Sequence, residues 1–384
     1  MLMWARKLAH ENIGRQGCLA FLKGGRDMFE DILKSAATHQ QTSAPTGEDG
    51  LMSNDKVRIA VLGVGGAGCN TIDRIMKGGI RSATTIAINT DNLHLRTVNA
   101  HKRVLIGAGI TKGLGAGGHP EVALRCAEGN KDKLREVIGD NELVFLCAGM
   151  GGGTGTGASP VIAEVAKDQG AIVVSIVTLP FALEKVRMKK ALWGLEQLAA
   201  KSDTVIVIDN NRLVSYVPNL PINEAFNVAD AITARAVRGI ADTIMIPSLM
   251  NMDYADVRSV MSDGGISLIS VGEGRGNERV EHVVKNTLEH PLLDVSYEGA
   301  KGAMLHITGG TGLTLGEAIE IGEKVTAAFD PNANVKIGAR LDPSYNDLVE
   351  VTSIVTGLKS PQIFGRKVEE PQKEVMVMGD INYL

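Results

Sequence analysis

Three short glycine-rich segments of this 384-residue chain have a composition that suits anion binding. They are GVGGAG at 63–68, GLGAGG at 113–118 and GGGTGTG at 151–157. Glycine lets backbone N–H groups approach a ligand closely, and a row of such groups forms an anion-binding concavity. The third segment adds two threonine hydroxyls but is not followed by the Lys-Ser/Thr pair of a Walker A loop. Together the three segments predict a site for a di- or triphosphate that is held mainly by backbone amides.

A fourth segment, NMDYADV at 251–257, offers carboxylates instead. Asp253 and Asp256 are three residues apart, so they share one face if the segment is helical. Carboxylates repel a polyphosphate, which makes them unexpected companions for the glycine segments in one pocket. Taken alone, the motif is most simply a solvated acid pair at the start of a helix.

Continuous apolar runs precede the first and third glycine segments and recur along the first half of the chain. Helical patterns separate most of these runs, as in a parallel sheet that is covered on both faces. Ligands of such sheets bind outside the carboxyl ends of the strands. We therefore predict an α/β fold with a Rossmann-like, mostly parallel sheet. The predicted strands are 57–62, 84–88, 142–148, 171–177 and 204–208.

The rest of the chain predicts a long central helix and a second, smaller α/β domain. Apolar residues step by three and four from Pro221 to about Ile244, as on one face of a helix. Strand-like runs at 266–272, 302–308 and 349–357 alternate apolar with polar residues, which favours a mixed sheet. Two further helices are predicted near 279–288 and 315–328.

These patterns divide the chain into five parts. We expect an N-terminal extension with an amphipathic helix and a linker, a nucleotide-binding domain, a connecting helix, a second domain and a flexible tail. Their predicted ranges are 1–55, 56–220, 221–245, 246–357 and 358–384.

Composition excludes several classes of protein. Forty basic and 44 acidic residues give a formal charge of −4, so nothing in the overall charge favours nucleic acid as a partner. No stretch has the roughly 18 uncharged apolar residues that would predict a membrane span. The four cysteines form no CxxC pair, which fits a reducing cytoplasm. Cys126 and Cys147 lie in apolar contexts and are predicted to be buried thiols.

The glycine segments resemble the phosphate loops of the FtsZ family, the prokaryotic relatives of tubulin. The resemblance spans about 57–357 and includes TLPF at 178–181 and INTD at 88–91. It implies a self-assembling GTPase that forms head-to-tail filaments and a cell-division ring at mid-cell in the cytoplasm. Its cofactors would be GTP or GDP and Mg²⁺, with a monovalent cation as a further candidate at the subunit interface. Its first partner would be another copy of itself.

The resemblance also assigns roles to individual residues. Glu184 would contact the ribose and Arg187 the phosphates, while Asn210, Phe226 and Asp230 would bind guanine. The segment EKVR is one residue shorter than the common pattern, which makes Arg187 the weaker of these assignments. The implied phosphate-binding residues are Gly65, Gly66, Ala116, Gly117, Gly118, Gly152, Thr154, Gly155 and Thr156.

In the FtsZ family the acidic segment lies at the opposite end of the subunit and meets the nucleotide of the next one. The resemblance therefore implies that Asn251, Asp253 and Asp256 complete a neighbour's active site and orient the attacking water. Mg²⁺ is expected to be held through GTP and water, without a direct protein ligand. Tethering or division proteins would bind the tail or the N-terminal helix.

Two alternatives stay open at this point. One is a paralogue of the FtsZ/tubulin group that controls cell shape. The other is an NAD-dependent oxidoreductase, in which Gly63, Gly65 and Gly68 form a dinucleotide fingerprint and Asp91 binds the ribose. The oxidoreductase leaves the other two glycine segments and the acidic segment without a role.

Overall fold

The computed structural model describes residues 57–80, 82–211, 222–245, 250, 253–262, 265–289 and 297–358. The predicted N-terminal extension and almost all of the predicted tail lie outside these residues. Within the described part, no helix has the length and apolar character that a membrane crossing requires.

Ten strands form one continuous sheet in the order β3-β2-β1-β4-β5-β6-β7-β10-β8-β9. The first six are parallel and follow the doubly wound order of dinucleotide-binding folds. The strands are β1 (Ile59–Val64), β2 (Thr84–Asn89), β3 (Lys102–Leu105), β4 (Leu143–Gly149), β5 (Ile172–Leu179), β6 (Thr204–Asp209), β7 (Gly265–Gly274), β8 (Gly302–Gly309), β9 (Asn334–Leu341) and β10 (Val349–Thr356).

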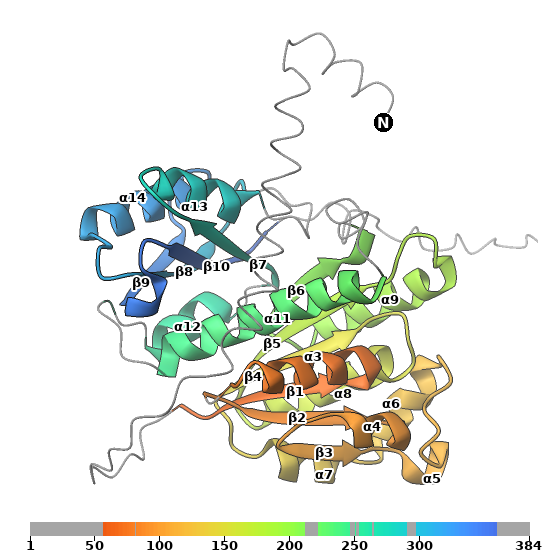
Figure 1. Ribbon diagram of the computed structural model, residues 1–384. Coiled ribbons are helices and arrows are strands. Elements are labelled where there is room, and N and C mark those ends of the chain that lie inside the picture. Colours follow the sequence, from red (N-terminus) through yellow and green to blue (C-terminus); the bar gives the residue numbers. More distant parts are fainter. Residues whose placement is uncertain are drawn as a thin grey trace, which may run out of the picture.

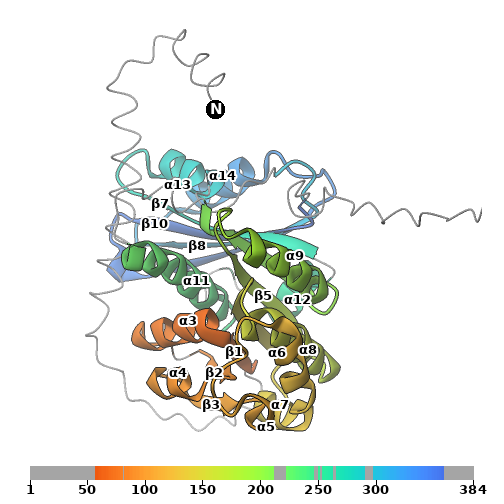
Figure 2. The ribbon, with the colours of Figure 1, turned by 90° about the vertical axis from the view of Figure 1, so that its right-hand side faces the viewer.

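Helices cover both faces of the parallel part of the sheet, as Figure 2 shows. One face packs against α3, α4, α11 and α12, and the other against α6, α7, α8 and α9. The described helices are α3 (Gly65–Lys77), α4 (Asn92–Thr97), α5 (Ala108–Thr111), α6 (Pro120–Glu128), α7 (Lys131–Ile138), α8 (Thr154–Asp168), α9 (Lys185–Ala199), α11 (Ile222–Met245), α12 (Tyr254–Met261), α13 (Arg279–Leu288), α14 (Leu315–Thr326) and the 3-10 turn Pro343–Tyr345.

Burial on both faces explains why the central strands are continuous apolar runs. In β1, Ile59 and Val61 belong to one core, whereas Ala60 and Leu62 belong to the other. All six residues of β1 are buried. The predicted parallel sheet is therefore confirmed, and its strands coincide with the predicted apolar runs to within a few residues.

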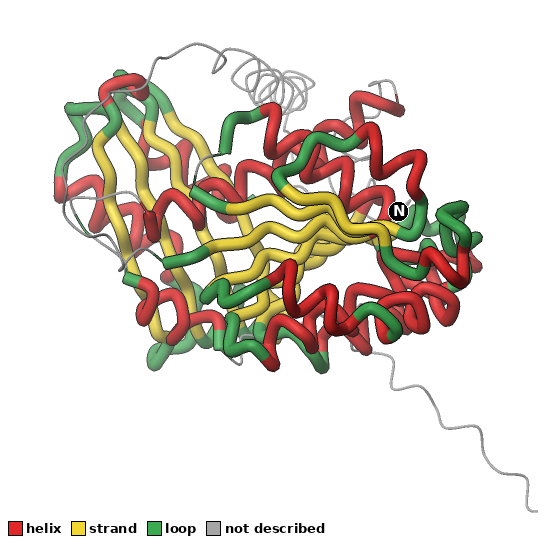
Figure 3. The backbone as a smooth tube through the Cα atoms, turned by 90° about the horizontal axis from the view of Figure 1, so that it is seen from below, coloured by secondary structure: helices red, strands yellow, loops and turns green. Residues whose placement is uncertain are grey.

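The second half of the molecule carries the predicted mixed sheet, formed by β7, β10, β8 and β9 (Figure 1). Helices α13 and α14 pack on one face of it around Leu305, Ile307 and Val351. This sheet is continuous with the first, because β6 pairs with β7 at three positions, from Thr204↔Gly265 to Ile206↔Ser267. In Figure 3 the strands form a single layer whose direction changes between the two halves.

Two strands escaped the prediction, β3 and β9. In β3 only Val104 is fully buried and Lys102 and Arg103 are exposed, so no apolar run marks it. In β9 the residues from Asn334 to Ile337 are at least partly exposed. Cys126 and Cys147 are buried as predicted, and burial raises the pKa of Cys147 to about 12.

Candidate nucleotide site at the carboxyl ends of the strands

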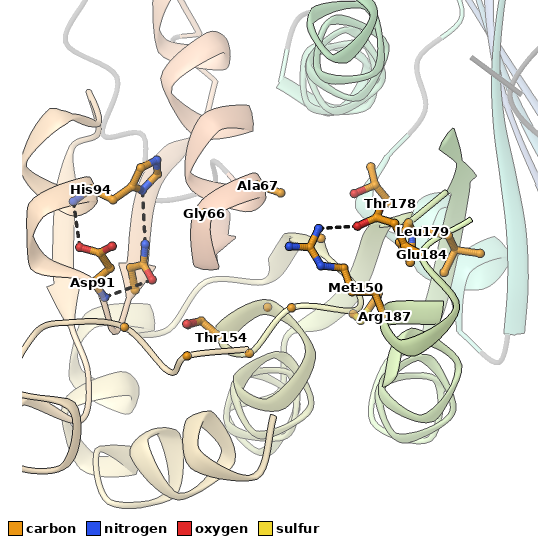
Figure 4. A pocket seen from close by; sticks show the side chains of 18 of the residues that line it. Gly66, Ala67, Asp91, His94, Met150, Thr154, Thr178, Leu179, Glu184 and Arg187 are labelled. Carbon is orange, nitrogen blue, oxygen red and sulfur yellow. Dashed lines mark hydrogen bonds and ion pairs between the residues drawn. The ribbon is translucent and has the colours of Figure 1, made fainter. Parts of the chain in front are cut away.

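A cavity of about 540 Å³ opens where β1, β2, β4 and β5 end (Figure 4). The beginning of α3 and the beginning of α8 meet there, because α3 follows β1 directly and α8 follows β4 after the glycines 151–153. The residues lining it are Gly66, Ala67, Asn89, Asp91, His94, Leu114, Gly115, Gly117, Gly149, Met150, Gly152, Gly153, Thr154, Gly155, Thr178, Leu179, Pro180, Phe181, Glu184, Arg187 and Asn210.

Both helix beginnings present free N–H groups to the cavity. Neither α3 nor α8 has a side-chain cap or an acidic residue in its first turn. The first N–H groups of a helix have no partner within the helix, and its dipole favours an anion at this end. Two uncapped helix beginnings at one cavity therefore form an anion site without any titratable donor.

The glycines of the loops fall into two groups. A Cβ atom at Gly66, Gly118 or Gly152 would meet nothing within 4 Å. At Gly68 and Gly155 it would instead overlap the backbone carbonyls of the strand β4. The first group leaves the backbone open to a ligand, whereas the second group is required for close packing of helix on strand.

The threonine hydroxyls of the third loop are already bonded within the protein. Thr156 is fully buried, and its Oγ1 accepts a 2.8 Å hydrogen bond from the Gly151 amide. Thr154 Oγ1 lies 2.7 Å from Thr90 Oγ1, which ties this loop to the end of β2. Thr156 therefore shapes the loop, and Thr154 reaches the cavity as one of its lining residues.

The second loop has a backbone that only glycine adopts readily. Gly113, Gly115, Gly117 and Gly118 have φ values of 75°, 86°, 59° and 76°. Its carbonyls are bound from both sides: the Asn92 amide donates to Gly113, and Lys190 Nζ donates a 2.6 Å hydrogen bond to Gly118. The loop is thus held between the β2–α4 connection and helix α9.

Glu184 and Arg187 lie together at one side of the cavity, as Figure 4 shows. Arg187 Nη1 donates a 2.6 Å hydrogen bond to Glu184 Oε2, and the Phe181 amide donates to Glu184 Oε1. The guanidinium is largely exposed, with 65% of the Arg187 side chain accessible. The pair therefore places one acceptor and one mobile cation beside the uncapped helix beginnings.

Two of the residues assigned to guanine, Asn210 and Asp230, have described side chains, and of these Asn210 lines the cavity. Asn210 is buried and its Oδ1 has no hydrogen-bond partner. Asp230 on α11 accepts a 3.0 Å hydrogen bond from Thr71 Oγ1 of α3. Burial raises the pKa of Asp230, while the Thr71 hydrogen bond and the charge of Arg74 oppose that rise. Phe226 belongs to α11, but its side chain lies outside the described residues.

The acidic segment lies at the other end of the strands. Asp253 is exposed and caps α12, accepting a 2.7 Å hydrogen bond from the Asp256 amide. Tyr254 Oη donates a 2.7 Å hydrogen bond to the carbonyl of Glu142, just before β4 begins. The glycine loop follows the opposite end of β4, so α12 and the beginning of α8 lie at opposite ends of this strand (Figure 1). The cavity, which Gly152 and Thr154 line, is therefore far from α12. Asn251 lies outside the described residues.

Comparison with known proteins identifies the family to which this chain belongs. The model of the Tubulin/FtsZ family GTPase domain matches residues 58–218, and that of the FtsZ family C-terminal domain matches 265–359. Cell division protein FtsZ 2 of Methanocaldococcus jannaschii is 53% identical over 86% of this chain and 90% of its own length. The chain belongs to the tubulin/FtsZ family. Its GTPase domain makes it a GTPase that binds guanine nucleotide.

Solved structures agree with this membership. An empty FtsZ dimer from M. jannaschii is 42% identical, with a TM-score of 0.74 over 85% of this chain and 92% of that one. CetZ2 from Haloferax volcanii, solved as a GTPγS-bound protofilament, is 20% identical with a TM-score of 0.67 over 79% of this chain and 94% of that one. At that identity the CetZ structure shows the shared fold alone.

The residues that the sequence analysis assigned to the nucleotide fall into two groups, those that line the cavity and those that do not. Eight of them line the cavity, and they come from five different segments. Gly65, Ala116, Gly118 and Thr156 belong to the same loops but do not line it, and Asp230 lies beside α3. The residues that line it are Gly66, Gly117, Gly152, Thr154, Gly155, Glu184, Arg187 and Asn210.

Sequence reasoning gave Asn89, Asp91 and His94 no part in a GTP site. All three line the cavity (Figure 4). Asp91 caps α4 by accepting from the His94 amide at 3.1 Å, and Asn89 Oδ1 accepts from the Thr90 and Asp91 amides. The INTD motif at the end of β2 is the available signal, but from the sequence it serves as a mark of the family, and Asp91 has a role only in the oxidoreductase alternative.

Proposed function

We propose that this chain polymerises head to tail and hydrolyses GTP at the junction between subunits, forming the ring that divides the cell. In this proposal, residues 56–220 form a GTP-binding domain, residues 221–245 form a connecting helix, and residues 246–357 form an activating domain. The proposal is supported by the family membership and by the wide separation of the cavity from the acidic segment.

That separation is the observation that carries the mechanism. Seven residues of β4 lie between the segment that Tyr254 contacts and the third glycine loop. At about 3.3 Å per residue the strand spans roughly 20 Å. An acid at one end of a subunit cannot reach a phosphate at the other end of the same subunit. A second subunit stacked on the cavity brings its own acidic segment to the nucleotide.

Phosphoryl transfer depends mainly on positioning and charge stabilisation. The amides of the glycine loops would hold the phosphates, and Asp253 and Asp256 of the neighbour, with Asn251, would orient the attacking water. Glu184 and Asp91, carboxylates that line the cavity, are already engaged by Arg187 and the His94 amide. Mg²⁺ therefore fits best as an ion held by phosphate oxygens and water, where it would neutralise developing charge. A monovalent cation fits best beside the neighbour's acids.

Guanine would be recognised on the side of the cavity that faces α11. Asn210 Oδ1 is buried without a hydrogen-bond partner, so it can accept a hydrogen bond from the base. Asp230 can accept from the N1–H and the 2-amino group, which guanine has and adenine lacks. Phe226 would stack on the base. Glu184 would contact the ribose, and Arg187 would contact the phosphates.

Division, rather than control of cell shape, is favoured by the relatives. Those named as cell division proteins are 44–53% identical to this chain. We place the protein in the cytoplasm at mid-cell. Tethering or division partners would bind the N-terminal extension or the tail.

Replacing Asp253 with alanine tests the shared site. Asp253→Ala should bind GTP and sediment with it as the parent does, because the cavity is untouched. Its GTP turnover should fall by about 100-fold, since a positioning group of the active site is lost. Turnover is measured as phosphate release from sedimented polymer. Asp132→Ala, which removes a fully exposed acid of α7, is the control. Parental turnover in Asp253→Ala would refute the shared site.

A further inference from the structure

Strand β9 contacts the acidic segment once and the residues on either side of it twice. Met250 forms an antiparallel bridge with Ala339, with hydrogen bonds of 3.2 and 3.3 Å in the two directions. Further along the strand, Lys336 Nζ lies 2.8 Å from Asp256 Oδ1, and Asn334 Nδ2 donates to Ser259 Oγ at 3.2 Å. The segment that carries the acids is therefore aligned on β9 on both sides of Asp253.

The spacing of these contacts follows from the two elements. Asn334 and Lys336 are two apart and point to the same side of a strand, about 6.6 Å from each other. Ser259 and Asp256 are three apart and lie on the same face of a helix, about 4.5 Å from each other along its axis. Strand and helix run in opposite senses, and Asp253 continues the same helix face at the next step of three.

Lys336 also changes the charge of this surface. Asp253 and Asp256 together carry −2, and the lysine reduces the net charge of the three residues to −1. The Lys336 ammonium lowers the pKa of the Asp256 carboxyl, so this acid remains ionised. Both side chains of the pair are about one-third exposed, so the pair lies at the surface that a stacked subunit would cover.

We propose that Lys336 is a positioning residue for GTP hydrolysis, which holds the Asp256 carboxylate and offsets part of the negative charge that approaches the neighbour's triphosphate. This inference rests on the proposed function, in which the acidic segment acts on the next subunit. It explains how two carboxylates can approach a polyphosphate at all. Without the lysine, the Asp256 carboxylate is held by the longer, 3.4 Å hydrogen bond from the Asp253 amide, and the segment repels the phosphates more strongly.

The test measures GTP turnover per sedimented subunit for Lys336→Met, which keeps most of the side-chain stem but removes the charge. Turnover should fall by about tenfold, since a catalytic carboxylate is misplaced. GTP affinity should not change, because the cavity lies at the opposite edge of the sheet. Lys336→Arg, which keeps a cation, should recover most of the turnover. The matched control is Lys324→Met, which removes a lysine that pairs with Glu320 on α14.

A double-mutant cycle shows whether the lysine acts through Asp256. In the Asp256→Asn background, Lys336→Met should change turnover by less than about twofold, because its partner is already altered. Parental turnover in Lys336→Met, effects that simply multiply in the double mutant, or a loss of polymer at unchanged turnover per polymerised subunit would each overturn the proposal. None of these results would refute the shared site itself, which the Asp253→Ala variant tests separately.

Discussion

Gly66 and Gly68 are two residues apart in the first turn of α3, yet a side chain would affect them in opposite ways. Gly66 faces open space and has an ordinary backbone conformation, whereas Gly68 packs against the Cys147 carbonyl of β4. The glycine pattern in the sequence marks both positions equally. Only the environment of each Cα distinguishes a glycine that leaves room for a ligand from one that allows a helix to pack closely on a strand.

This difference predicts opposite outcomes for two alanine variants. Gly66→Ala should weaken GTP binding while raising the free energy of unfolding by up to about 1 kcal/mol, because alanine favours a helix over glycine. Gly68→Ala should lower that free energy by about 1–3 kcal/mol, because its Cβ overlaps the backbone. Urea denaturation and nucleotide titration check both. Unaltered GTP affinity in Gly66→Ala would contradict the assignment of this loop to the phosphates.

At the scale of elements, α9 supports two of the glycine loops along one stripe. Gly151 lies against the Arg187 carbonyl, Lys190 binds the Gly118 carbonyl, and Gly194 lies against the Thr156 methyl group. The positions on α9 are spaced by three and four, as on one helix face. The helix therefore sets the distance between the second and third loops.

Lys190 is the polar contact in this stripe, so its loss should loosen the second loop. Lys190→Met should weaken GTP binding by about tenfold, because a charge-assisted hydrogen bond to the loop is removed. Nucleotide titration at fixed salt measures the change. The control is Lys189→Met, which alters the exposed neighbouring lysine. Equal affinity in the two variants would show that the loop is held well enough by its other contacts.

Strands and loops differed in how well the sequence predicted them. The central strands were predictable because burial on both faces leaves long apolar runs, as in IAVLGV of β1. β9 was not, because it lies at an edge and carries Lys336 and Arg340 among its apolar residues. The phosphate loops were found because each is a local motif. The contacts of Lys190 and Lys336 join segments that are distant in the sequence, so no local sequence pattern predicts them.

At the scale of the whole molecule, the sheet determines where the two half-sites lie. Parallel strands have their carboxyl ends on the same side of the sheet, and the glycine segments are therefore brought together there. The second half of the chain returns to the opposite edge through α11, and places α12 beside the beginnings of β4 and β6. The subunit is thus polar along the strand direction, with one half-site at each edge.

A polar subunit of this kind makes catalysis depend on assembly. GTP turnover per subunit should be low below a threshold concentration and rise steeply above it, because an isolated subunit lacks the neighbour's Asp253 and Asp256 beside its phosphates. Phosphate release over a concentration series, with sedimentation measured in parallel, should give the same threshold. A specific rate that is constant across the series would contradict a site shared between subunits.

The uncapped beginnings of α3 and α8 have a further consequence. A backbone amide has no proton that it loses near neutral pH, and it offers nothing for acetylation, phosphorylation or oxidation. In the proposed mode of binding, the affinity of these helix beginnings for the phosphates would therefore not be altered by modification of the amides themselves. Regulation by chemical modification would have to act on side chains, either Lys190 behind the second loop or the lysine and aspartates at the opposite end of the strands. A change at the opposite end would stop hydrolysis of the next subunit's nucleotide and leave the binding of the subunit's own nucleotide unchanged.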